Sequence, residues 1–220
     1  MVVTKYMMFA LAATALNATT LTETIAPKFS GFYTGVQAGI NTTQNTLQEI
    51  DCKNRVKYGS QSWLGGLFAG YGVAVGKSVY IGGEVFGNLV DNKIFFKDNP
   101  FCKVSLKNAG NIGAKLRFGY GVSPQTMMFL GLGLEYSEWV LKSETQAGMM
   151  PDINEVTKTE KRSVVFSPSV GADIYLNNHV FLRPEYSYVC KVKMRINIAF
   201  NGQKTGATQH RFTMGFGYKI

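Results

Sequence analysis

Eight charged side chains lie inside segments that are otherwise apolar or small, and they are the first candidates for chemistry. They comprise four acids and four bases: Glu84, Glu135, Asp173, Glu185, Lys115, Arg117, Arg183 and Arg211. Carboxylates placed in pairs can serve as general acid and base, and buried acids and bases can also form structural ion pairs. The equal number of acids and bases favours structural pairing, because buried charges must be paired and hydrogen-bonded.

Other catalytic arrangements have few residues to draw on. The sequence holds two histidines, His179 in an Asn-Asn-His run and His210 just before Arg211 and Phe212. Neither has the serine or cysteine and the acid that a nucleophilic triad needs, and neither has the spacing of a metal ligand. The sequence therefore predicts no catalytic residues, no metal site, no cofactor and no enzymatic activity.

The composition narrows the class of protein that could carry these charges. The chain has 220 residues, of which 45% are hydrophobic and 17% charged, with 24 glycines, three cysteines and a net charge of +9. The low charge content excludes a disordered chain, and three cysteines exclude a disulfide-dense scaffold. No uncharged apolar run of about 18 residues follows the N-terminus, so a bundle of transmembrane helices is excluded as well. A mean hydropathy of −0.01 leaves a soluble all-β protein or a membrane β-barrel.

The N-terminus has the layout of a secretory signal peptide. Lys5 precedes an apolar stretch over 6–16, and small-residue sites follow that end at Ala15 and Ala18. A positive start, a short apolar region and small residues at the cleavage site are typical of such peptides. We expect a signal peptide over 1–18, a short N-terminal segment over 19–30 and one barrel domain over 31–220.

Hydrophobicity along the rest of the chain follows a period of two, which indicates β-strands. In the first segment Phe32, Val36 and Ile40 share one face, while Gly35 and Gln37 share the other. Seven more segments repeat this alternation. The predicted strands cover about residues 32–40, 63–76, 79–89, 106–122, 127–141, 164–176, 180 onward and 210–220.

The predicted connections alternate between short and long. Short turns fall at 76–78, 123–125 and 177–179, whereas long loops are expected over 42–61, 90–105, 142–162 and 190–207. Even strand number and strict alternation of turn length are typical of outer-membrane barrels. We therefore predict an all-β fold, an eight-stranded antiparallel up-and-down transmembrane β-barrel.

The eight charges share the polar parity of these strands, which would face the lumen. Most strand glycines have the same parity, as a narrow barrel requires if large side chains are to fit inside. An eight-stranded barrel is just wide enough for side chains to fill, so we expect a filled polar lumen with the eight charges in one ion-pair network. Pro168 and Pro184 lie inside predicted strands, and because proline cannot donate to the ladder we expect a bulge or broken pairing at each.

Three stretches resemble a known family. Residues 31–39 (GFYTGVQAG) are similar to the first strand, and residues 183–188 (RPEYSY) to the penultimate strand, of the outer-membrane β-barrel family of OmpA-like and OmpX-like domains and alphaproteobacterial surface antigens. Phe212, Phe216 and Tyr218 resemble the C-terminal signal read by the barrel assembly machinery, although Ile220 stands where that family usually ends in phenylalanine. The resemblance implies an outer-membrane location with periplasmic termini and extracellular loops. No peptidoglycan-binding domain is expected after the last strand.

Residues in the expected loops suggest partners. Lys191, Lys193, Arg195 and Lys204 form a basic stretch with no acid between residues 190 and 207, which is either a solvated rim or a contact for lipopolysaccharide phosphates or a sulfated host glycan. No motif for nucleic-acid binding is present.

The cysteines leave two alternatives open. Cys52 and Cys102 fall in neighbouring expected loops and could form a disulfide in an oxidising compartment, or stay reduced. Cys190 is the odd cysteine in either case, and it is either free or paired with a cysteine of another molecule.

Together these features predict a structural surface protein or antigen of the outer membrane, with adhesion through its loops. The alternatives are a small porin-like channel for solutes and a soluble ligand-binding barrel.

Overall fold

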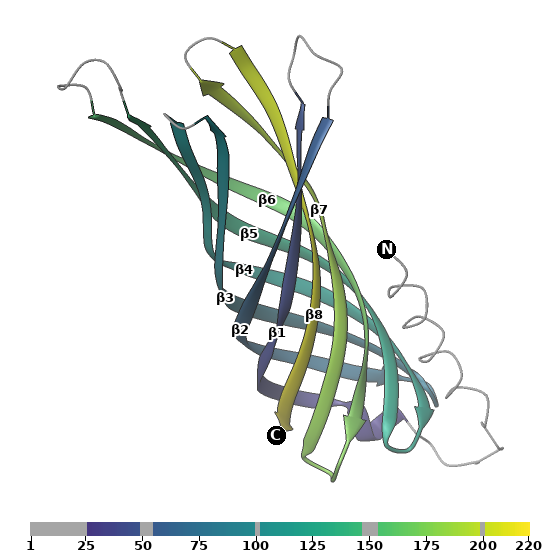
Figure 1. The fold of residues 1–220 in the computed structure, drawn as a ribbon. Coiled ribbons are helices and arrows are strands. Elements are labelled where there is room, and N and C mark those ends of the chain that lie inside the picture. The colour runs from purple at the N-terminus through teal and green to yellow at the C-terminus, as the bar shows by residue number, and fades with distance from the viewer. Residues whose placement is uncertain (1–25, 49–54, 100–101, 147–153, 199–200) are drawn as a thin grey trace.

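A computed structural model describes residues 26–48, 55–99, 102–146, 154–198 and 201–220, which form one closed antiparallel barrel (Figure 1). A short 3-10 helix precedes the eight strands in chain order: η1 (Ala26–Phe29), β1 (Gly31–Gln48), β2 (Arg55–Val75), β3 (Val79–Asn99), β4 (Cys102–Ser123), β5 (Thr126–Gln146), β6 (Asn154–Tyr175), β7 (Val180–Ile198) and β8 (Asn201–Lys219). Each strand pairs with its neighbours in sequence, and β1 pairs with β8 to close the ring. The predicted eight-stranded up-and-down barrel is therefore confirmed.

Side chains alternate between the two faces of the barrel wall because the period of a strand is two. Along β1, Phe32 and Val36 are 63% and 54% exposed on the outer face, while Tyr33 is 4% exposed in the lumen. Leucine, valine and aromatic side chains cover the outer faces of the other strands in the same way. In the part of the chain that the structure describes, no helix has the length and apolar character to cross a bilayer.

The three short turns lie where the sequence predicts them. Gly76 begins the first turn with φ of 74°, a conformation that glycine adopts without strain. In the turn between β6 and β7, the Asn177 side-chain oxygen accepts hydrogen bonds from the backbone N–H groups of His179 (2.8 Å) and Val180 (2.7 Å). Asparagine favours turns through bonds of this kind.

The long loops are the largest departure from the predicted fold. Strands continue through most of 42–61, 90–105, 142–162 and 190–207, and each hairpin projects beyond the apolar band. The prediction was wrong because alternation marks a strand only where one face is apolar. Beyond the bilayer both faces of a strand can meet water, so the polar sequence hides the strand.

The ladder between β6 and β7 is interrupted at both prolines. Its pairs are Ser169↔Ser187, Val170↔Tyr186, Gly171↔Glu185, Ile174↔Leu182 and Tyr175↔Phe181. Pairing therefore stops just before Pro168, and it skips the step at which Pro184 would face Ala172. Broken pairing at these positions is confirmed, and no register shift accompanies it, because the pairs on both sides of the gap keep one register.

The β2–β3 ladder also ends early, at Leu64↔Val90. The remaining six ladders run close to the outer ends of their strands. Above the barrel the described strands consequently divide into two four-stranded sheets, β3–β4–β5–β6 and β7–β8–β1–β2, whose outer ends diverge in Figure 1.

Close packing of the wall predicts a sharp difference between two glycines. A Cβ at Gly39 would clash with the Phe212 carbonyl oxygen and lie 2.8 Å from Thr213 Cα, whereas a Cβ at Gly83 would meet nothing within 4 Å. We expect Gly39→Ala to lower the free energy of unfolding by about 1–3 kcal/mol. Gly83→Ala, the matched control, should leave it unchanged in urea titrations of the barrel in lipid vesicles. Equal stability of the two variants would contradict the packing argument.

Candidate functional site

The eight predicted lumen charges come from six strands and all point into the barrel. Their exposed fractions range from 0% for Arg117 to 8% for Lys115. The strands bring them to this position because each lies on the inward parity of β3, β4, β5, β6, β7 or β8. The structure divides them into a central cluster of six, which is Glu84, Lys115, Arg117, Asp173, Arg183 and Glu185, and a separate pair, Glu135 and Arg211.

Arg183 donates three hydrogen bonds within the central cluster. Its Nε donates to Asp173 Oδ1 at 2.6 Å, and its Nη1 donates to Glu84 Oε2 at 2.5 Å. Arg117 Nη2 donates to Asp173 Oδ2 at 2.8 Å and its Nη1 lies 3.5 Å from Glu84 Oε2. Two guanidinium groups therefore share two carboxylates, and the fork of donors on Arg183 matches the two oxygens of Asp173.

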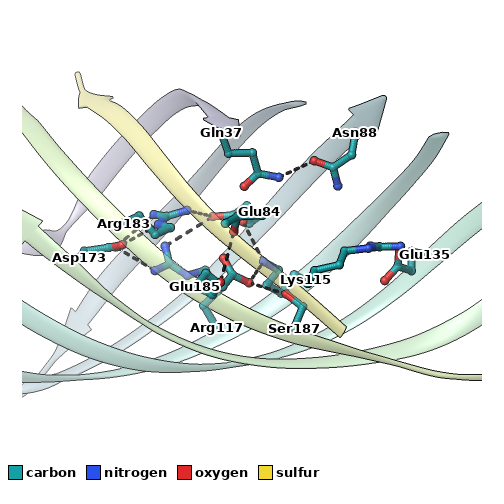
Figure 2. A network of polar contacts seen from close by, with 12 residues as sticks. Gln37, Glu84, Asn88, Lys115, Arg117, Glu135, Asp173, Arg183, Glu185 and Ser187 are labelled. Atoms are coloured by element: carbon teal, nitrogen blue, oxygen red, sulfur yellow. Dashed lines mark hydrogen bonds and ion pairs between the residues drawn. The ribbon is translucent and has the colours of Figure 1, made fainter. Parts of the chain in front are cut away.

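Lys115 completes the cluster on its other side. Its ammonium donates to Glu185 Oε1 and lies 3.3 Å from Glu84 Oε1. The cluster thus holds three acids and three bases, and its net charge is zero. Figure 2 shows Glu84 in the middle of these contacts, between Arg183 and Lys115.

Glu135 of the second pair lies to one side of the central cluster in Figure 2. Arg211 Nη1 donates to Glu135 Oε2 at 2.6 Å, and Asn111 donates to the same oxygen. Glu135 Oε1 and Arg211 Nε have no hydrogen-bond partner among the described residues. Both side chains line a small cavity with a free volume of about 20 Å³, which is enough for about one water molecule.

Aromatic rings enclose the two central arginines. The Arg117 guanidinium lies 3.8 Å from the centroid of Phe129, and that of Arg183 lies 4.4 Å from the centroid of Phe68. Tyr33 connects the rings to the ions, because its hydroxyl donates to Glu84 (2.9 Å) and accepts from Arg117 (3.0 Å). Cation–π contacts of this kind strengthen when they are desolvated.

Toward the end of the barrel that carries the tight turns, buried aromatic rings fill the lumen. We call them the aromatic plug: Phe29, Tyr33, Phe68, Tyr175 and Phe181. Phe29 of η1 packs edge-on against Tyr175 at 5.3 Å, and Tyr175 packs against Phe181 at 5.2 Å. Two further contacts fix the segment that carries Phe29: Ser30 Oγ accepts from the Ala74 N–H at 2.8 Å, and Lys219 donates to the Lys28 carbonyl at 2.7 Å. The ions and the plug together occupy much of the described part of the lumen.

The sequence did not identify the plug. The sequence pattern predicts polar and small side chains on the inward face of the strands. The structure also buries large rings there: Tyr33, Phe68, Phe129 and Phe181. A usable signal was present, since these rings share the parity of the lumen glycines. Gly217 and Gly35, for example, face Phe181 and Phe68 at distances that would exclude a Cβ.

The remaining candidate residues lie elsewhere. His179 is in an exposed turn with Nδ1 3.1 Å from the Lys219 carbonyl oxygen, and His210 Nδ1 is 2.7 Å from the Tyr186 hydroxyl on the outer face. Cys190 is a free thiol. The described residues contain no group of three histidine, cysteine or acidic side chains that could hold a metal.

For some predicted site residues the structure describes nothing, and for others it describes the backbone alone. Cys52 is not described and only the backbone of Cys102 is, at the start of β4 rather than in a loop. The basic residues Lys191, Lys193 and Arg195 lie in β7 and Lys204 in β8, where Arg195 and Lys204 are backbone register partners. Their side chains are not described.

The comparisons with known proteins agree with this architecture. The model of the outer membrane protein beta-barrel domain matches residues 8–219. The chain belongs to this family. No match is found among curated proteins.

Solved structures that resemble this chain share little sequence identity with it. OprG of Pseudomonas aeruginosa is 16% identical with a TM-score of 0.50, covering 87% of this chain and 97% of that one. Neisserial surface protein A is 15% identical with a TM-score of 0.45, covering 87% and 98%. Ail of Yersinia pestis, the attachment invasion locus protein, is 11% identical with a TM-score of 0.42, covering 86% and 99%. Family membership supports an outer-membrane protein, and likeness at this identity shows the fold alone.

Removing one central guanidinium should destabilise this barrel strongly. Arg183→Met leaves Asp173 and Glu84 buried with fewer partners, which costs about 3–5 kcal/mol. Arg162→Met is the matched control, because Arg162 is 67% exposed and forms a surface pair with Glu138 at 3.5 Å, worth at most about 1 kcal/mol. Urea unfolding in lipid vesicles measures both, and a small effect at Arg183 would show that the cluster contributes little to stability.

Proposed function

We propose that this outer-membrane barrel is a structural surface protein with a closed lumen, and that its projecting strands meet partners outside the cell. The observation that carries the proposal is the filling of the lumen by a neutral six-charge cluster beside an aromatic plug. Buried acids and bases that neutralise one another stabilise a barrel without lining a path. The lumen carboxylates accordingly act as ion-pair partners and not as an acid–base pair, and the protein is not an enzyme.

The proposed orientation follows from the two ends of the barrel. The described N-terminal residues and Ile220 lie at the end with the tight turns, and the hairpins project from the opposite end (Figure 1). Outer-membrane barrels have short periplasmic turns and longer extracellular connections. The termini are then periplasmic, residues 1–18 act as the signal peptide for export, and the barrel assembly machinery reads the C-terminal strand.

The proposed external contact is the basic group, which we define as Lys191, Lys193, Arg195 and Lys204. These residues lie on the adjacent projecting strands β7 and β8, and the segment 190–207 contains no acid. A concentrated charge of one sign attracts partners of the opposite sign. The partner is therefore anionic, with lipopolysaccharide phosphates and host surface molecules as the available sources.

If the lumen is closed, the barrel should not conduct ions. The purified barrel, reconstituted in planar bilayers and checked for folding by heat-modifiable gel mobility, should produce no stable conductance steps. A porin of known conductance, recorded in the same bilayers, serves as the positive control. A reproducible open channel would instead establish the porin-like alternative.

The orientation is tested by labelling intact cells with a membrane-impermeant maleimide. In a background in which Cys52, Cys102 and Cys190 are serine, Asn201→Cys at the outer end of β8 should be labelled. Lys77→Cys in a tight turn should react only after the outer membrane is permeabilised. The reverse pattern would invert the proposed orientation.

A further inference from the structure

The interrupted wall between β6 and β7 presents two free strand edges above the barrel. Beyond Ser169↔Ser187 the two strands have no backbone pairs, although β6 continues to residue 154 and β7 to residue 198. Each strand keeps its ladder on the other side, since β6 pairs with β5 out to Gln146↔Asn154 and β7 pairs with β8 out to Ile198↔Asn201. Both strands are therefore ordered edges, which we call the β6–β7 seam (β6 residues 154–168 and β7 residues 188–198).

An ordered edge is a template for a further strand. Every second residue of an edge strand directs its N–H and C=O toward the missing neighbour, and such rows pair readily with another chain. The β7 side of the seam spans 188–198, about 35 Å at about 3.3 Å per residue. A length of this order is sufficient for recognition by strand addition, in which backbone hydrogen bonds supply affinity.

The two sides of the seam differ in charge, and this difference determines which kind of strand could pair with the β7 edge. Residues 188–198 of β7 carry Lys191, Lys193 and Arg195 and no acid. On the β6 side, Glu155 and Glu160 nearly balance Lys158, Lys161 and Arg162, and Arg162 is already paired with Glu138. A second copy of this chain would bring its own basic β7 edge to the seam, and like charges on facing strands are destabilising. The same repulsion protects the open edge from self-association, whereas an acidic strand would neutralise it.

We propose that the β6–β7 seam binds an extended acidic segment of a partner protein, which adds as a strand along the β7 edge. This inference rests on the proposed surface function and names the class of its anionic partner. Pro168 stands where the seam begins, and it cannot donate the backbone hydrogen bond that a continuous β6–β7 ladder would require there. The opening is thus encoded in the chain.

The native thiol of Cys190 allows the two edges of the seam to be joined by an engineered disulfide. If the register of the lower ladder continued, Phe166, which is exposed on the outer face, would face Cys190, which lies at the register shift between Val189 and Val192. Phe166→Cys, with Cys52 and Cys102 replaced by serine, therefore permits a disulfide across the seam under oxidation. The reduced form of the same variant is the control for folding and for loss of the phenyl ring.

Binding is measured with a fluorescent peptide of about twelve residues, the span of the β7 edge, in which valine and threonine alternate with glutamate. The reduced variant should bind the peptide, and closing the seam should weaken binding by about tenfold or more, because the peptide then loses several backbone hydrogen bonds. A backbone N-methylated peptide of identical charge tests the native protein independently and should lose a similar factor. A lysine-for-glutamate peptide should not bind.

Other results would overturn the proposal. Equal binding of the plain and N-methylated peptides would mean that charge alone attracts the ligand. Binding of a heparin fragment or of lipopolysaccharide, together with failure of the acidic peptide, would assign the anionic contact to a glycan or lipid phosphate. Neither result bears on the closed lumen, which bilayer recording tests separately, so failure of this inference is distinguishable from failure of the proposed function.

Discussion

The constraint on which the structure depends is that a bilayer offers backbone groups no hydrogen-bond partners. A sheet that crosses hydrocarbon must therefore close, and eight strands close around an interior that side chains fill completely. Alternation follows, since every second side chain meets lipid and the others must pack inside. The glycines on the inward parity follow as well: rings such as Phe181 and Phe68 occupy space that a Cβ at Gly217 or Gly35 would need.

Filling so narrow a lumen with charges requires that each charge find partners from several strands. Glu84 from β3 meets Arg183 from β7, and Lys115 from β4 meets Glu185 from β7, so the cluster links parts of the wall that share no ladder. Such bonds add little net stability compared with apolar packing, but they penalise any arrangement that separates the partners. The cluster therefore fixes the register of distant strands relative to one another, and the surrounding aromatic rings exclude water from it.

The sequence alone predicted the features that follow from this constraint. Strand number, the tight turns, the inward parity of the eight charges and the weak pairing at the prolines are all written in local patterns. Which charge meets which could not be predicted, because the partners depend on the shear of the closed ring. The plug was missed because Phe29, Tyr33 and Phe181 look like ordinary apolar residues until the ring closes, and the strand extensions were missed because no lipid imposes alternation there.

The β6–β7 wall shows how side chains compensate for a ladder that proline breaks. Two consecutive pairs are missing from the lower ladder: Ala172 with Pro184, and Asp173 with Arg183. At the second of these pairs Arg183 donates two hydrogen bonds to Asp173, at 2.6 Å and 3.1 Å, and just below it Tyr175 packs on Phe181. Two charge-assisted hydrogen bonds are stronger than the backbone hydrogen bonds that they replace, so the lower wall stays closed. Above Pro168 the described contacts include no comparable side-chain pair between β6 and β7, and there the wall parts. Each interruption of the β6–β7 ladder thus lies beside one proline: Pro184 at the gap that the Arg183–Asp173 pair bridges, and Pro168 at the start of the open seam.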